Sequence, residues 1–215
     1  MRTRSVLHIT PYLAPAWAHG PVPAAVWTLA TAQAGRGWHV SVLTTDAVAP
    51  HERVPAGSSN VNGVHVVRVR NAVGLITSWM QISTPVGWTR AARALLAQPP
   101  RIVHLHELRS LEARLIAPLV PAGTVLLAST HGYESQVQMP LSSRARMQER
   151  LLRPAWSRID RVLVDSALER EAVLRLAARN RLSWSDANLS VTTPGEPAGT
   201  DLMSLYEDVF ARARV

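Results

Sequence analysis

Short apolar runs alternate along this chain with segments of helical periodicity. The runs have the length and composition of buried strands, and they occupy residues 5–10, 40–45, 64–70, 102–106, 125–130, 161–165 and 189–193. Between them, apolar side chains recur every three or four positions, which predicts helices over residues 22–36, 86–98, 141–156 and 166–180, and from 111 onward. This alternation predicts an α/β protein with one doubly wound, mainly parallel, Rossmann-like sheet.

Three connections lack such a pattern. Prolines and a glycine in residues 11–21 predict a loop, and residues 47–63, rich in Pro, Gly, Ser and Asn, predict an exposed connection. Residues 71–85 are poorly patterned, although Trp79 and Met80 favour a part-buried loop or a lid. Ser166 and Glu169 have the spacing of a capping box, so Ser166 should begin a helix.

The end of the chain predicts one further helix, over residues 201–214. Its apolar side chains form a single stripe, which must pack against another part of the protein. The stripe consists of Leu202, Leu205, Tyr206, Val209, Phe210 and Ala213.

A histidine and a carboxylate follow two of the buried runs. His106 and Glu107 close residues 102–106, and His131 and Glu134 follow residues 125–130. Ligands bind at the carboxyl ends of strands in an open parallel sheet, so this edge is the candidate site. The two glutamates could form a carboxylate pair, or each could form salt bridges with Arg109 or with the arginines of residues 144–153.

Two histidines near the same edge could begin a metal site. His104 and His106 are two positions apart on one strand and therefore share a face. No third ligand is evident at a suitable spacing, so we predict no metal site and expect these histidines to be buried in local hydrogen bonds.

The charge balance favours anionic partners. The formal net charge is +8, and all 23 basic residues are arginine. Arg144, Arg146, Arg150 and Arg153 could face an anionic lipid or a nucleic acid, or form a solvated helix face. No nucleic-acid-binding motif is evident, so we expect no specific nucleic-acid partner.

Cysteine is absent, which excludes disulfides, thiolate metal sites and cysteine nucleophiles. No stretch of sequence is long and apolar enough to span a bilayer. We therefore expect a cytoplasmic protein, with peripheral contact at the inner membrane as an open alternative.

Six motifs in order along residues 6–194 resemble the amino-terminal half of family-4 GT-B glycosyltransferases. They are residues 6–10 with the loop 15–20, GWHVSVLT at 37–44, GVHVVR at 63–68, IVHLH with Arg109 and Ser110, STHG at 129–132, and SALERE at 166–171. The resemblance implies one half of a GT-B fold, the acceptor-binding side, in polysaccharide or glycoconjugate biosynthesis. The donor-site Arg/Lys and the paired glutamates of the family have no counterpart here.

The resemblance also implies a division of the chain. Residues 1–194 correspond to the Rossmann-like domain, and residues 195–215 to a linker and the last helix of a full-length enzyme, which packs back on that domain. No cofactor is expected, and a nucleotide sugar would serve as donor only if a partner supplied the donor domain. The expected partners are such a protein or a second copy of the chain, together with a sugar or glycolipid acceptor.

By the same resemblance, His131 lies where the family places a histidine facing the reaction centre, which makes it the candidate catalytic residue. Ser166 is a candidate phosphate-binding residue, with helix capping as the structural alternative. Gly20 is followed by Pro21, which has no N–H to donate, where the family has two glycines. This departure and the missing donor domain favour an alternative, a non-catalytic binding or regulatory protein. The expected acceptor-binding residues are Trp17, His19, Gly20, His106, Glu107, Arg109, Gly132, Tyr133 and Glu134.

Overall fold

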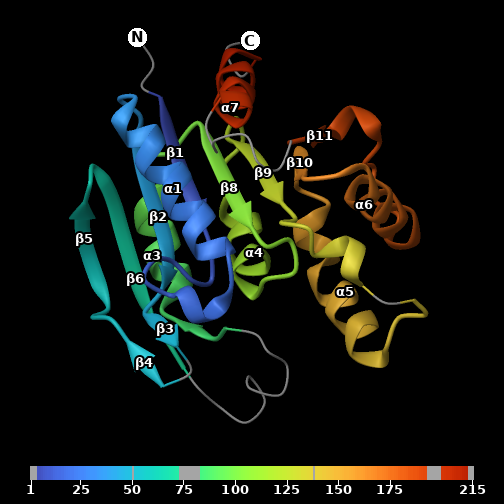
Figure 1. Ribbon diagram of the computed structural model, residues 1–215, viewed down its shortest axis with the longest axis horizontal. Helices are drawn as coiled ribbons and strands as arrows, with labels where there is room; N and C mark the ends of the chain where they lie inside the picture. Colours follow the sequence, from blue (N-terminus) through green and yellow to red (C-terminus); the bar gives the residue numbers. More distant parts are fainter. Residues whose placement is uncertain (1–3, 50, 73–82, 138, 193–199, 213–215) are drawn as a thin grey trace.

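One twisted sheet with helices on both faces forms the centre of the molecule (Figure 1). The computed structural model describes residues 4–49, 51–72, 83–137, 139–192 and 200–212. The strands are β1 (Ser5–Ile9), β2 (His39–Thr45), β3 (Ala47–Ala49), β4 (Glu52–Arg53), β5 (Gly57–Val61), β6 (Val64–Asn71), β7 (Pro85–Val86), β8 (Ile102–His106), β9 (Val125–Ser129), β10 (Arg161–Val164) and β11 (Leu189–Val191). The helices are α1 (Val22–Gly35), α3 (Trp88–Leu96), α4 (Leu111–Ile116), α5 (Ser143–Trp156), α6 (Ala167–Asn180) and α7 (Thr200–Arg212), with short 3-10 turns η1 (Trp17–His19), η2 (Ala117–Leu119), η3 (Glu134–Gln136) and η4 (Asp186–Asn188).

The order of the strands places a topological switch point at the centre of the sheet. The order is β11-β10-β9-β8-β1-β2-β6-β5, and every pair from β11 to β6 is parallel. The chain runs from β1 outward to β2 and β6, and then from β8 outward in the other direction. At such a reversal the connections leave in opposite directions, and a crevice opens beyond the carboxyl ends of the two central strands. The predicted fold class is confirmed.

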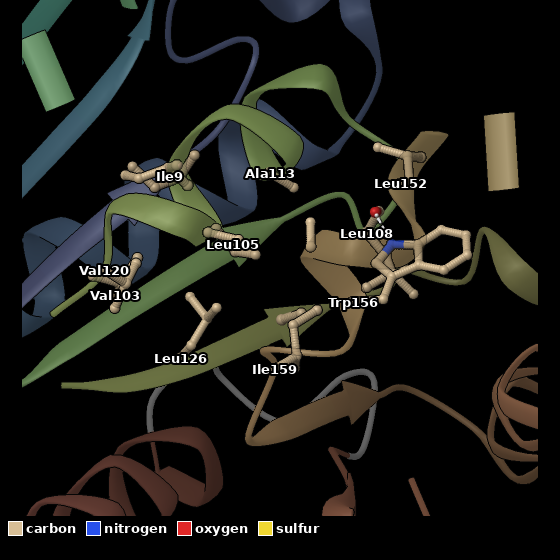
Figure 2. Packing of buried hydrophobic residues seen from close by; sticks show 14 of the residues in the cluster. Ile9, Val103, Leu105, Leu108, Ala113, Val120, Leu126, Leu152, Trp156 and Ile159 are labelled. Atoms are coloured by element: carbon tan, nitrogen blue, oxygen red, sulfur yellow. Dashed lines mark hydrogen bonds between the residues drawn. The ribbon is translucent and has the colours of Figure 1, made fainter. Parts of the chain in front are cut away.

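Alternate side chains of each strand enter two separate hydrophobic clusters, as the two-residue period of a strand requires. Leu7 and Leu105 belong to the cluster under α3, α4, α5 and α6. Val6 and Val42 belong to the cluster under α1 and α7. Figure 2 shows the first cluster, where the indole N–H of Trp156 donates to the carbonyl oxygen of Leu108 at 2.8 Å and so keeps a polar atom satisfied inside the core.

The prediction that residues 47–63 form an exposed connection was wrong in part. This segment contains β3, β4 and β5, and β5 pairs antiparallel with β6. All five residues of β5 are exposed, so no apolar pattern marks the strand, and its backbone hydrogen bonds to β6 hold it at the sheet edge. Of the predicted lid, Trp79 and Met80 lie outside the described residues, and the predicted helix that follows begins at Trp88.

Helix α7 covers the face of the sheet that carries Val6 and Val42. Met203, Tyr206 and Val209 are buried in that cluster, and Leu205 is half-buried against it. The predicted stripe omitted Met203, and the side chains of Leu202, Phe210 and Ala213 lie outside the described residues. The hydroxyl of Tyr206 is hydrogen-bonded to Nδ1 of His104 on β8, so α7 contacts the sheet through a polar pair as well as through apolar side chains.

Candidate functional site

A pocket of about 330 Å³ opens at the switch point, beyond the carboxyl ends of β1, β8 and β9. Its wall comes from the loop after β1, from His19 in η1, from the segment after β8, from the loop after β9, and from the first half of α5. These segments contribute Pro11, Tyr12, Glu107, Leu108, Arg109, Ser110, Leu111, Glu112, Thr130, His131, Tyr133, Glu134, Arg144 and Gln148, among others.

Six predicted site residues meet in this pocket, although they come from three loops far apart in sequence. Five others do not line it, and one of these, Ser166, is the N-cap of α6. Trp17, which is 53% exposed, and Gly20 lie in the loop before α1, Gly132 lies between lining residues, and His106 is buried behind His131. The six that line the pocket are His19, Glu107, Arg109, His131, Tyr133 and Glu134.

Two of the lining residues have left-handed backbone conformations. Glu107, directly after β8, has φ 70°, and His131, two residues after β9, has φ 51°. Few residues other than glycine adopt this conformation, which costs on the order of 1–3 kcal/mol and is concentrated at functional sites. The strain at two neighbouring strand ends therefore supports this edge as the site.

A chain of hydrogen-bonded imidazoles runs from the core to the pocket. Gln33 Oε1 lies 2.7 Å from His8 Nε2, His8 Nδ1 lies 3.0 Å from His106 Nε2, and His106 Nδ1 lies 3.1 Å from His131 Nε2. With the Gln33 oxygen as acceptor, each Nε2 carries the proton and donates, because a neutral imidazole has one donor and one acceptor. Nδ1 of His131, which makes no hydrogen bond to the described residues, is then left as an acceptor at the pocket.

Burial keeps these imidazoles neutral. It lowers the pKa of His8 and of His131 to about 4. It also lowers the pKa of His104 and His106 well below the usual value, and the neighbouring histidines add to the effect. A neutral imidazole keeps a lone pair at neutral pH, so His131 can accept a hydrogen bond or a proton there.

His8 brings a third imidazole to His104 and His106, which the sequence reasoning missed. Parallel register places His8 of β1 directly beside His104 of β8, and ligand atoms of the three residues lie within 4.8 Å of one another. Both nitrogens of each ring are already hydrogen-bonded, with His104 Nε2 2.8 Å from Ser129 Oγ. A metal ion could bind these three residues only by replacing those bonds.

Acid should destabilise the protein through this network. Between pH 6.5 and 4 the unfolded chain binds a proton at His8 that the folded protein does not, so the free energy of unfolding falls as the pH falls. Between pH 7 and pH 4, the free energy of unfolding of His8→Gln should therefore decrease by about 3 kcal/mol less than that of wild type, as measured by urea unfolding. His39→Gln, at the exposed start of β2, is the control. Parallel pH dependence in wild type and His8→Gln would contradict this assignment.

Two carboxyls that line the pocket, half-buried Glu107 and buried Glu112, form no ion pair with any described residue. Burial, and then the charge of Glu112, raise the pKa of Glu107 to about 7. Burial raises the pKa of Glu112 to about 7 even though the Ser83 hydroxyl donates to it. Both groups are therefore half protonated near neutral pH, where a carboxyl group can give or take a proton. Tyr12 and Glu112 were missed because nothing in their local sequence marks a pocket.

Glu134 forms a salt bridge instead of a carboxylate pair with Glu107. Arg109 donates from Nε and Nη2 to both oxygens of Glu134, at 2.7 and 2.8 Å, and from Nη2 to Glu149 of α5 at 2.8 Å. Glu149 also accepts from Arg179 of α6. This network fixes Arg109 at the pocket wall and joins the wall to two helices.

Ser166 begins α6, and its side chain accepts from the N–H of Glu169 at 3.1 Å. The predicted capping box is only half formed, because the Glu169 carboxylate is used elsewhere. It accepts from the backbone N–H groups of Glu134 and Ser135, at 2.9 and 2.8 Å. Glu169 therefore holds the loop behind the pocket, which a three-residue spacing along the chain could not reveal.

The start of α1 offers few donors to an anion. Pro21 is its N-cap and Pro23 lies in its first turn, and neither residue has an N–H. Gly20 has φ 87°, which favours glycine at this position.

A doubly wound parallel sheet with its pocket at the switch point, and a last helix returning to the sheet, is the architecture of one Rossmann-like half of a GT-B glycosyltransferase. The glycosyl transferase 4-like domain family matches residues 20–182, so the chain belongs to that family. A search of curated proteins found no match. None of the described helices is both long and apolar enough to cross a bilayer.

Solved structures support the same fold. A sucrose-phosphate synthase structure from Thermosynechococcus elongatus is 16% identical with a TM-score of 0.56, over 98% of this chain and 97% of that one. The catalytic domain of starch synthase IV from Arabidopsis thaliana, bound to ADP and acarbose, is 15% identical with a TM-score of 0.54, over 93% and 54%. An E. coli trehalose-6-phosphate structure bound with UDP-2-fluoro glucose is 10% identical with a TM-score of 0.51, over 94% and 50%. At these identities the likeness establishes the fold alone.

Proposed function

We propose that this chain is the acceptor-binding half of a sugar transferase in polysaccharide or other glycoconjugate biosynthesis. The observation that carries the proposal is the pocket at the switch point of a sheet that belongs to the glycosyl transferase 4-like family. The pocket combines aromatic walls with a few convergent polar groups, as small-molecule sites do. Tyr12 and His19 are stacked 3.6 Å apart between ring centroids on one side of it, and Tyr133 is 55% exposed.

Each polar group has a role in this proposal. His131 accepts a hydrogen bond from an acceptor hydroxyl through Nδ1, since Nε2 is bonded to His106. Glu107, with its pKa near 7, can take up the proton of such a hydroxyl. Arg109 is held by two carboxylates, so its guanidinium orients part of the wall without moving. Arg144 adds a positive charge to the pocket wall.

The donor half is assigned to a separate protein, and a second copy of the chain is the other partner to be expected. A sugar transferase of this architecture needs a second Rossmann-like domain for the nucleotide sugar, and two of the similar structures are about twice as long as the matched region. Residues 1–194 would then be the acceptor domain, and residues 195–215 a linker and a helix that packs back on it. We place the protein in the cytoplasm.

Native purification of the tagged protein from its own host, followed by mass spectrometry, tests the proposal. We expect a protein with a GT-B donor domain to copurify, and the mixed pair to transfer sugar from a nucleotide sugar. A lone monomer whose thermal unfolding is unchanged by nucleotide sugars, and a pair that transfers nothing, would contradict it.

The alternative is a non-catalytic binding or regulatory protein derived from a glycosyltransferase. Pro21 at the start of α1 favours it, because this residue has no N–H to donate where the family has a second glycine. Substituting Pro21→Gly distinguishes the two functions. A transferase impaired by Pro21 should gain activity in the pair, whereas a binding protein should remain inactive.

A further inference from the structure

Five arginines surround a hollow of about 370 Å³ on the far side of α5 from the pocket. The hollow lies between α5 and the end of α6, which run side by side at one side of the molecule (Figure 1). Glu149 is its one acidic lining residue. The arginines are Arg146, Arg150 and Arg153 of α5, with Arg179 and Arg181 at the end of α6.

Most of the positive charge of this arginine hollow is not paired with a carboxylate among the described residues. Glu149 is shared between Arg109, Arg179 and Asn180, so it has little capacity for the rest. The other acids of the two helices are also engaged, Glu169 with backbone N–H groups and Glu171 with Arg175. Over the described ranges, no carboxylate lies within 4.0 Å of the charged groups of four lining arginines, namely Arg146, Arg150, Arg153 and Arg181.

Placing these charges together costs stability. Arg146, Arg150 and Arg153 are four and three positions apart and so form one stripe of α5, where like charges repel by roughly 0.2–0.5 kcal/mol per pair. Arg181 adopts φ 54°, an uncommon conformation for arginine, as the C-cap of α6. Several guanidinium groups around one hollow suit the oxygens of a phosphate group, which would remove the repulsion.

Apolar side chains beside the stripe indicate the source of the phosphate. Met147 and Leu151, one turn apart on α5, are 49% and 47% exposed, and they flank Arg150. A helix face that combines exposed apolar side chains with arginines is typical of binding in the plane of an anionic membrane. We infer that the arginine hollow binds the phosphate headgroup of an anionic lipid, with Met147 and Leu151 entering the bilayer surface beside it.

This contact would hold the pocket close to the membrane surface, because the same helix, α5, lines both the hollow and the pocket. Arg144 and Gln148 of α5 line the pocket, while Arg146, Arg150 and Arg153 of the same helix line the hollow. Glu149 joins Arg179 of the hollow to Arg109 of the pocket. Lipid binding is measured on the chain alone, so its outcome does not depend on sugar transfer.

Cosedimentation with phosphatidylcholine vesicles, with and without phosphatidylglycerol, tests the inference. We expect binding only when phosphatidylglycerol is present, and the double variant Arg150→Gln, Arg153→Gln should weaken it roughly 30-fold. The matched control is Arg90→Gln, Arg93→Gln on α3, two exposed arginines with the same spacing and the same change of net charge. Met147→Ser with Leu151→Ser should weaken vesicle binding further. Unfolding midpoints of all variants should stay close to wild type, because every changed side chain is exposed.

Two outcomes would overturn the inference. If Arg90→Gln, Arg93→Gln weakened vesicle binding as much as Arg150→Gln, Arg153→Gln does, the binding would depend on net charge alone and not on the arginine hollow. Stabilisation of the protein by inorganic phosphate, lost in the Arg150→Gln, Arg153→Gln variant and accompanied by no vesicle binding, would make the ligand a free phosphate instead of a lipid.

Discussion

Replacing His131 by asparagine should lower the rate of sugar transfer by the reconstituted pair about 10²–10⁴-fold, the usual contribution of one positioned acid or base. Asparagine is chosen because it tolerates the left-handed conformation of residue 131 better than alanine does. The variant should therefore fold normally and lose only the imidazole. His39→Asn, at the opposite end of the sheet, should leave the rate unchanged.

The pH dependence of the same reaction separates His131 from Glu107. Since the pKa of His131 is about 4, the imidazole stays neutral above pH 5, and its protonation should not limit the rate near neutrality. The rate should instead change near pH 7, where Glu107 and Glu112 titrate, and Glu107→Gln should remove part of that change. A transfer rate for His131→Asn within a factor of about three of wild type would exclude His131 from the chemistry.

The second large effect concerns stability. Glu149→Gln should lower the free energy of unfolding by about 3 kcal/mol, because it leaves the buried Arg109 with one carboxylate and Arg179 with none. Urea unfolding measures the change. Glu171→Gln, which breaks the exposed pair with Arg175, is the matched control and should cost less than about 1 kcal/mol.

Acid should abolish the difference between Glu149→Gln and wild type. Burial alone would raise the pKa of Glu149, but hydrogen bonds from Arg179, Arg109 and Asn180 lower it to about 2. The carboxylate therefore stabilises the fold above pH 4.5, and this contribution is lost as the pH falls from 4.5 to 2. A difference that persists unchanged to pH 2 would show that the charge of Glu149 does not act on stability.

The sequence by itself determined most of the elements and the location of the site. Apolar runs such as residues 102–106 are strands, and the helical period of residues 22–36 became α1, since both patterns are local. Strand and helix alternate, so the order of the chain also required a parallel sheet with its loops at one edge. The sequence alone therefore places Glu107, Arg109, His131 and Glu134 at the same edge of the sheet.

Only the tertiary structure decided which side chains act on one another. His8 lies beside His104 because β1 pairs with β8 in parallel register. The apolar pattern of a strand does not indicate which other strand it pairs with. Glu169 turns from its own helix to the loop at Glu134, and Glu149 meets Arg109 forty residues away in sequence. Strand β5 is exposed and is held by backbone hydrogen bonds to β6, so no apolar pattern in the sequence indicates it. Local periodicity records which residues are buried, whereas partners, pKa values and the arginine hollow arise from the packing of distant elements.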